Sequence, residues 1–76
     1  MSPLPTLTGR EVPRVFQTLG WEVARTRGSH IILTKPGEIA TLSVPDHAGI
    51  AKGTLRSLVR LANLTVPEFL GARERA

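Results

Sequence analysis

Residues 21–44, with the sequence WEVARTRGSHIILTKPGEIATLSV, decide the fold of this chain. Apolar and polar residues alternate along most of this stretch, a period of two that is typical of strands. Gly28-Ser29 and Pro36-Gly37 interrupt the alternation: the first pair favours a tight turn or bulge, and the second a type II turn. Such short connections predict an antiparallel meander. The predicted strands are residues 21–27, 30–35 and 39–44.

A helix is predicted before the strands. Thr8 and Glu11 form a capping-box pattern, in which each side chain bonds the backbone amide of the other. Pro13 cannot donate a hydrogen bond to the carbonyl of Gly9, so we expect either a loose first turn or a later start. Gly20 is expected to end the helix in a left-handed conformation. The apolar residues at helical spacing are Val12, Val15, Phe16 and Leu19.

Two further helices are predicted after the strands. The first begins near Ala51, carries an apolar stripe and can end at Asn63. Thr65 and Glu68 form a second capping box, which with an early proline predicts a short helix over residues 66–71. The stripe of the longer helix consists of Leu55, Leu58, Val59 and Ala62.

The order helix, three strands, helix, short helix predicts a two-layer α+β domain, α-β-β-β-α(-α), with the helices on one face of a three-stranded antiparallel sheet. Ile31 and Leu33 share the face that should meet the helices, which leaves His30 on the open face. The expected parts of the chain are a flexible lead (residues 1–7), a single domain (8–71) and a frayed tail (72–76).

The composition excludes several classes of protein. The chain has 76 residues and no cysteine, which excludes disulfides and thiolate metal sites or nucleophiles. Two histidines and scattered acids argue against a closed zinc site, so we expect neither a metal nor a cofactor. The N-terminus lacks a signal-peptide pattern, and no apolar run approaches the ~18 residues of a membrane span. We therefore expect a cytoplasmic protein.

The charge of the chain favours an anionic partner. Ten lysines and arginines oppose six acids, for a net charge of +4, and eight of these ten cations are arginine. Arginine binds phosphate and carboxylate through a planar fork and stacks on bases. The expected partner is a nucleic acid or an acidic protein, and charge alone does not choose between them.

His30 is the first candidate for chemistry. Histidine transfers protons near neutral pH, and Arg25, Arg27 and Lys35 lie near it in the sequence. On an open sheet face it could act as the general base on a ribose 2′-hydroxyl, while the cations neutralise the adjacent phosphate. The alternative is a histidine that lies on an open sheet face without a function.

Lys52, Gly53 and Thr54 are a second candidate, because they open the predicted second helix. A helix N-terminus offers free amides and a partial positive charge, and these residues add a cation, close backbone approach and a hydroxyl. The alternative is ordinary capping, with Gly53 only easing the turn. The upstream glycine of a P-loop is missing at the required spacing, so nucleotide hydrolysis is not supported.

His47 is a third candidate, at the exit of the last predicted strand. It could protonate the leaving 5′-oxygen of a cleaved RNA or bind a phosphate. The alternative is a loop histidine that is hydrogen-bonded to a backbone carbonyl or to Asp46.

Taken together, these segments resemble the HicA toxin family of bacterial type II toxin–antitoxin modules. The resemblance covers roughly residues 7–70, and its most specific part is Gly-Ser-His followed by Lys-Gly-Thr-Leu. Ile31 stands where many relatives have a second histidine, which excludes a paired-histidine mechanism at that position. The matching segments are residues 7–11, 19–21, 27–30, 44–47, 52–56 and 64–69.

The resemblance implies a fold like that of double-stranded-RNA-binding domains and a metal-independent endoribonuclease that cleaves mRNA, with His30 as the catalytic residue. It also implies a HicB-like antitoxin as partner, and we expect the free toxin to be a monomer. Two alternatives stay open, a non-catalytic RNA-binding module and an adaptor that docks an acidic protein. The residues expected to contact RNA are Arg25, Arg27, Gly28, Ser29, Lys52, Gly53 and Thr54.

Overall fold

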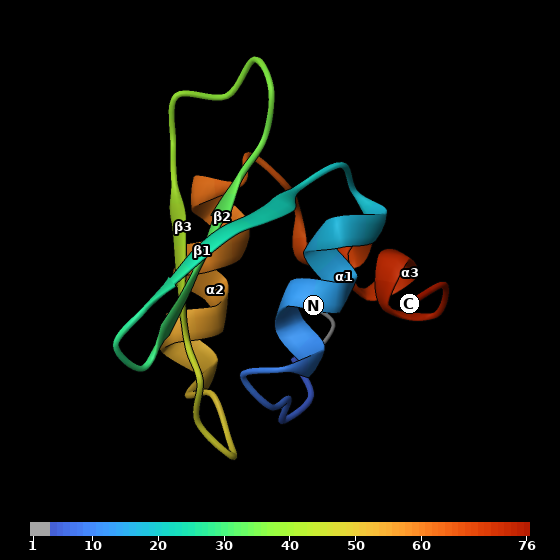
Figure 1. Ribbon diagram of the computed structural model, residues 1–76. Coiled ribbons are helices and arrows are strands. Elements are labelled where there is room, and N and C mark those ends of the chain that lie inside the picture. Colours follow the sequence, from blue (N-terminus) through green and yellow to red (C-terminus); the bar gives the residue numbers. More distant parts are fainter. Residues whose placement is uncertain (1–3) are drawn as a thin grey trace.

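The computed structural model describes residues 4–76, which fold into a helix, three strands and two further helices (Figure 1). The predicted α+β class and element order are therefore confirmed. None of the helices in residues 4–76 has the length and apolar character needed to cross a membrane. The elements are α1 (Glu11–Thr18), β1 (Glu22–Arg27), β2 (His30–Thr34), β3 (Leu42–Pro45), α2 (Lys52–Leu61) and α3 (Val66–Arg73).

The sheet has the order β1-β2-β3, and both strand pairs are antiparallel. Leu33 pairs with Leu42, and Ile31 pairs with Val44, so these four side chains share one face. Leu33, Leu42 and Val44 are buried and Ile31 is half-buried, as predicted for the face that meets the helices. α2 packs against β3 and α1 against β1, while α3 contacts both helices (Figure 1).

The start of α1 follows from its capping box and its proline. Thr8 and Glu11 bond each other's amides at 3.2 and 3.1 Å, as predicted. The amide of Val12 bonds the carbonyl of Thr8, but Pro13 has no N–H for the next bond, to Gly9. The regular helix therefore begins at Glu11, after a turn at residues 9–10, and this is the later start that the sequence left open beside a loose first turn.

The ends of the helices also agree with the predicted signals. Gly20 has φ +95° after α1, and Asn63 has φ +61° after α2, both in the left-handed region. Thr65 and Glu68 form a complete capping box at the start of α3. α3 continues to Arg73, two residues beyond the prediction, and buries Ala72 in the core.

The third strand is shorter than predicted. The turn at Pro36-Gly37 is present, because Gly37 has φ +85° and the amide of Glu38 bonds the carbonyl of Lys35 at 3.0 Å. However, the strand begins at Leu42, and Ile39 is fully exposed in the connection between β2 and β3. The prediction of a strand from residue 39 is wrong, because the register puts residues 39 and 40 opposite Pro36 and Lys35, beyond the end of β2 at Thr34.

The segment before α1 packs against the domain. Leu4 and Leu7 are buried members of the core, and the amide of Ile50 bonds the carbonyl of Leu7 at 2.8 Å. Residues 4–7, expected as part of a flexible lead, are therefore part of the folded domain, and residues 1–3 lie outside the described residues. Two leucines in a segment that contains prolines carry no periodic signal, although a small core needs their apolar surface.

Candidate functional site

His30 opens β2 and lies on the sheet face that the helices leave open. It pairs with Arg27 on β1 and with Pro45 on β3. Residues directly opposite each other in an antiparallel sheet point to the same face, so Arg27 and His30 share a face, opposite to that of Ile31. Both side chains are exposed. This placement is the one that the alternation of residues 30–34 predicted.

The imidazole ring of His30 has one hydrogen-bond partner within residues 4–76. Its Nδ1 lies 3.1 Å from the hydroxyl oxygen of Ser43 on β3. Ser43 pairs with Ile32 and is the diagonal neighbour of His30 on the same face. Sequence reasoning missed Ser43, because the contact depends on the register between two strands. If the pairing of His30 with Pro45 had been known, the residue two positions before Pro45, on the same face of the sheet, would have identified Ser43.

The open face has an apolar residue beneath its polar ones. Ile32 belongs to this face with Arg25 and Ser43, yet only 7% of its surface is exposed. It is not a member of the main core cluster. His30 lies at the edge of this face, near the β1–β2 turn.

The cations of the open face are free to bind an anion. Arg25 and Arg27 lie on it through their pairing with Ile32 and His30. Among residues 4–76, one ion pair is formed, between Arg10 and Asp46. Arg25 and Arg27 therefore have no carboxylate within 4.0 Å, and their charge is not neutralised inside the protein.

The turn beside His30 is tied to the exit of β3. Gly28 has φ +60° and Ser29 does not, which are the φ signs of a type II′ hairpin turn. The carbonyl of Ser29 accepts a hydrogen bond from the amide of Asp46 at 2.7 Å. A Cβ on Gly28 would meet no atom within 4 Å, so its surface is open to a ligand. Ser29 is also exposed.

The start of α1 clamps the segment that follows β3. The amide of Gly9 bonds the carbonyl of His47 at 2.8 Å. A Cβ at residue 9 would overlap the carbonyl oxygen of Pro45 and lie 2.6 Å from the Cα of Asp46. The contact between Arg10 and Asp46, with 3.7 Å between Nε and Oδ1, reinforces the same junction. Sequence reasoning did not anticipate this role of Gly9.

His47 is close to His30 in the fold but is not bonded to it. It follows Pro45, the partner of His30, by two residues, and it is exposed. Within residues 4–76 its ring makes no hydrogen bond, and the carboxylate of Asp46 lies near Arg10 instead. The alternative of a ring held by Asp46 or by a carbonyl is therefore not what the structure contains.

The start of α2 leaves its backbone amides open. Ala51 at the N-cap makes no side-chain hydrogen bond, and the first turn contains no acidic residue. Lys52, Gly53 and Thr54 are exposed, so the alternative of ordinary side-chain capping is not realised. The β1–β2 turn, the β3–α2 connection and the start of α2 lie at the same end of the molecule (Figure 1). Gly28, Ser29, Lys52, Gly53 and Thr54 belong to these segments, whereas Arg25 lies further along β1, opposite Ile32.

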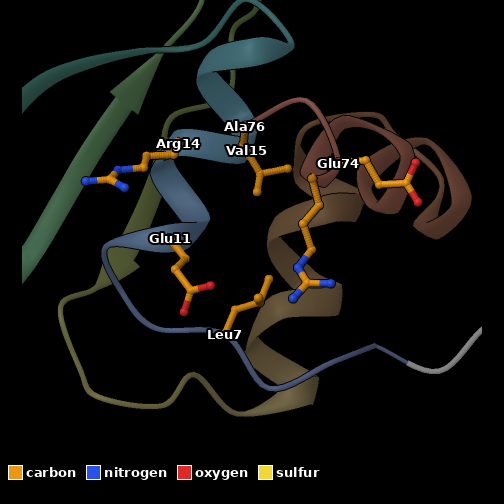
Figure 2. A pocket seen from close by; sticks show the side chains of 7 residues that line it. Leu7, Glu11, Arg14, Val15, Glu74 and Ala76 are labelled. Atoms are coloured by element: carbon orange, nitrogen blue, oxygen red, sulfur yellow. The ribbon is translucent and has the colours of Figure 1, made fainter.

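One cavity of the described residues lies away from His30. It has a volume of about 270 Å³ and lies between α1 and the end of α3 (Figure 2). Val15 and Leu7 form its apolar wall, and Glu11, which lines it, already bonds the amide of Thr8. No group of three histidine, aspartate or glutamate side chains in residues 4–76 is arranged to hold a metal ion. The candidate site is therefore an open surface.

Comparisons with known proteins identify the family. No curated protein matches the chain with significance. The sequence profile of the family described as "HicA toxin of bacterial toxin-antitoxin" matches residues 9–64, which is more than half of the chain. That range contains His30, Ser43, His47 and the start of α2, the residues of the candidate site. The chain belongs to the HicA toxin family of bacterial toxin–antitoxin systems.

Proposed function

We propose that this protein is a toxin that cleaves mRNA, with His30 as its catalytic residue. The observation that carries the proposal is the pairing of His30 with Arg27 on the uncovered face of the sheet. A proton-transfer group and an unpaired cation then stand side by side where a nucleic-acid backbone can reach both. Membership of the HicA family supports the toxin class.

The proposed reaction needs a proton acceptor and a neutralised phosphate. The free nitrogen of His30 takes the proton of a ribose 2′-hydroxyl, and the 2′-oxygen attacks the adjacent phosphorus. The bond from phosphorus to the 5′-oxygen breaks, and this oxygen takes a proton from the protonated ring of His30, from His47 or from water, which leaves a 2′,3′-cyclic phosphate and a 5′-hydroxyl end. Arg25 and Arg27 stabilise the charge that develops on the phosphate oxygens. These protein groups supply the chemistry without a metal ion.

RNA is held by the basic end of the molecule in this proposal. Lys52 supplies a cation, and the exposed amides of Gly53 and Thr54 supply donors to a phosphate. Gly28 and Ser29 allow the RNA backbone to approach the catalytic edge closely. His47 follows the partner of His30 by two residues, and in this proposal it binds a phosphate or protonates the leaving 5′-oxygen.

An antitoxin partner is part of the proposal. A toxin of this family implies an antitoxin, and we propose a HicB-like protein that covers the open face. A face with two unpaired arginines and a histidine is complementary to an acidic surface. Such a cover would exclude RNA from His30.

The test is incubation of the purified chain with RNA in the presence of EDTA, followed by analysis of the product ends. We expect cleavage that leaves 2′,3′-cyclic phosphate and 5′-hydroxyl ends. Salt-sensitive binding without cleavage would instead support the non-catalytic RNA-binding module. Absence of both binding and cleavage would favour the protein adaptor.

A further inference from the structure

We propose that Ser43 is a positioning residue for His30: its hydroxyl accepts the Nδ1–H of the ring, so that Nε2 is the atom that exchanges protons with RNA. This inference rests on the proposed ribonuclease function and adds a residue to its machinery. The observation behind it is the 3.1 Å contact between Nδ1 of His30 and the hydroxyl oxygen of Ser43.

Ser43 is held firmly enough to orient a ring. Its neighbours in β3, Leu42 and Val44, are both fully buried, and Ser43 itself pairs with Ile32 on β2. The backbone at residue 43 is therefore fixed by the core on one side and by the ladder on the other. A serine side chain has a single χ angle that places its oxygen, so little freedom remains. A diagonal separation of about 7–8 Å between Cα atoms is within reach of a histidine.

The contact assigns different tasks to the two ring nitrogens. A neutral imidazole carries one proton, and the nitrogen without it is the base. If Nδ1 donates to the oxygen of Ser43, then Nε2 is bare and can take a proton from a 2′-hydroxyl. After the transfer both nitrogens carry protons, and the bond from Nδ1 to Ser43 is unchanged. The ring therefore cycles between base and acid without moving.

The opposite arrangement would block the reaction. A hydroxyl that donated to Nδ1 would leave the proton on Nε2, which then could not act as a base. Among residues 4–76 no carboxylate is hydrogen-bonded to His30, so no acidic side chain plays the orienting role that aspartate has in catalytic triads. In this chain the hydroxyl of Ser43 takes that place.

The test compares two variants of equal shape, Ser43→Thr and Ser43→Val. Threonine keeps the hydroxyl, valine lacks it, and both β-branched residues suit a strand. One net hydrogen bond is worth about 0.5–1.5 kcal/mol, so we expect Ser43→Val to lower kcat about 2-fold to 10-fold, with RNA affinity unchanged. Ser43→Thr should restore most of the rate. Equal rates of the two variants would overturn the proposal.

A second measurement separates this inference from the proposed function. The ¹⁵N chemical shifts of the His30 ring report which nitrogen carries the proton, and they need no RNA. At a pH where the ring is neutral, we expect the Nδ1–H form in the wild type and in Ser43→Thr. We expect a shift toward the Nε2–H form in Ser43→Val. An Nε2–H ring in the wild type would contradict the role of Ser43, whether or not the protein cleaves RNA.

Discussion

Arg27 and His30 pair across β1 and β2, so the proposed function places a phosphate-binding cation beside the proposed proton-transfer group. The guanidinium has no carboxylate within 4.0 Å in residues 4–76, so binding to phosphate does not require an internal ion pair to break. Arg25 lies one row further along the same face, opposite Ile32. A backbone that runs along β1 would meet both cations.

Replacement of Arg27 by alanine should weaken RNA binding mainly through lost counterion release. The slope of log K against log salt concentration should become shallower by about 0.7, the value for one phosphate contact on a single strand. Titration of a labelled RNA at several salt concentrations measures this slope. Arg73→Ala is the matched control, because Arg73 is the last residue of α3 and lines the cavity between α1 and the end of α3. An equal change in both variants would contradict a specific role for Arg27.

The position of His30 on the open face could be predicted from the sequence, whereas its contact with Ser43 could not. Alternation along residues 30–34 placed His30 on the open face, because the period of two depends only on local backbone geometry. Ser43 is linked to His30 by the register of β2 and β3, and the predicted third strand began at Ile39 in place of Leu42. Register depends on how two segments that are distant in the sequence pair with each other. The alternation within a single strand does not determine this pairing.

The junction between α1 and the exit of β3 is the element-scale feature that positions the site. Gly9 approaches the backbone of residues 45–47 so closely that a methyl group there would overlap main-chain atoms. Main-chain atoms cannot rotate away as a flexible side chain can. The junction therefore requires glycine at this position, although its φ is not in the left-handed region.

We expect Gly9→Ala to lower the free energy of unfolding by about 1–3 kcal/mol, the usual cost of overpacking. Gly71→Ala in α3 is the control, since a Cβ there meets no atom within 4 Å. That change should be neutral or raise stability by up to about 1 kcal/mol, because alanine favours helices over glycine. Urea unfolding of both variants measures the difference. The junction would lose its proposed importance if Gly9→Ala were as stable as Gly71→Ala.

The capping box of α3 should make its stability depend on pH. Hydrogen bonds from the amide and the hydroxyl of Thr65 hold the pKa of Glu68 below 4.5. A carboxyl whose pKa is lowered by folding stabilises the protein fully above pH 4.5, and this contribution is lost as the pH falls through the folded-state value. Thr65→Ala should cost about 0.5–2 kcal/mol at neutral pH, and less in acid. Unfolding curves at pH 7 and pH 3 test this; an equal cost at both would be the contrary result.

The ends of the helices were easier to predict than the ends of the strands, because helix ends depend on local signals and strand ends depend on pairing with another strand. The capping boxes at Thr8 and Thr65, and the left-handed residues Gly20 and Asn63, are local signals that act within one turn. By contrast, the start of β3 depends on where its antiparallel partner β2 ends, and Ile39 is exposed although its residue type favours a strand. The length of the partner strand is set by the tertiary fold. The sequence of residues 39–44 alone therefore could not predict where β3 begins.

At the scale of the whole molecule, the core extends beyond the predicted domain at both ends. Leu4 and Leu7 precede α1 and residue 8, where the domain was predicted to begin. Ala72 lies in α3, one residue beyond the predicted end at 71. All three side chains are buried in one cluster. A domain of this size buries a smaller fraction of its surface than a larger one, and its margin of stability is narrow. The terminal segments therefore contribute to folding and indirectly to the site.

Leu7→Ala should destabilise the whole domain by about 2–5 kcal/mol, the range for leucine removal from a core. Leu61→Ala is the same substitution at a position that is 54% exposed, and it should change stability by less than about 0.5 kcal/mol. Thermal unfolding of the two variants gives the comparison. Similar melting temperatures would mean that the segment before α1 does not stabilise the domain.

The measurement that tests the central proposal most directly is the rate of RNA cleavage by purified wild type and His30→Ala, with melting curves of both. His30 is exposed, so its removal should leave the fold intact. General acid–base catalysis contributes about 10²–10⁴-fold, and we expect a loss of cleavage of that size with RNA binding retained. Equal cleavage by two equally folded proteins would contradict the assignment of His30 as the catalytic residue.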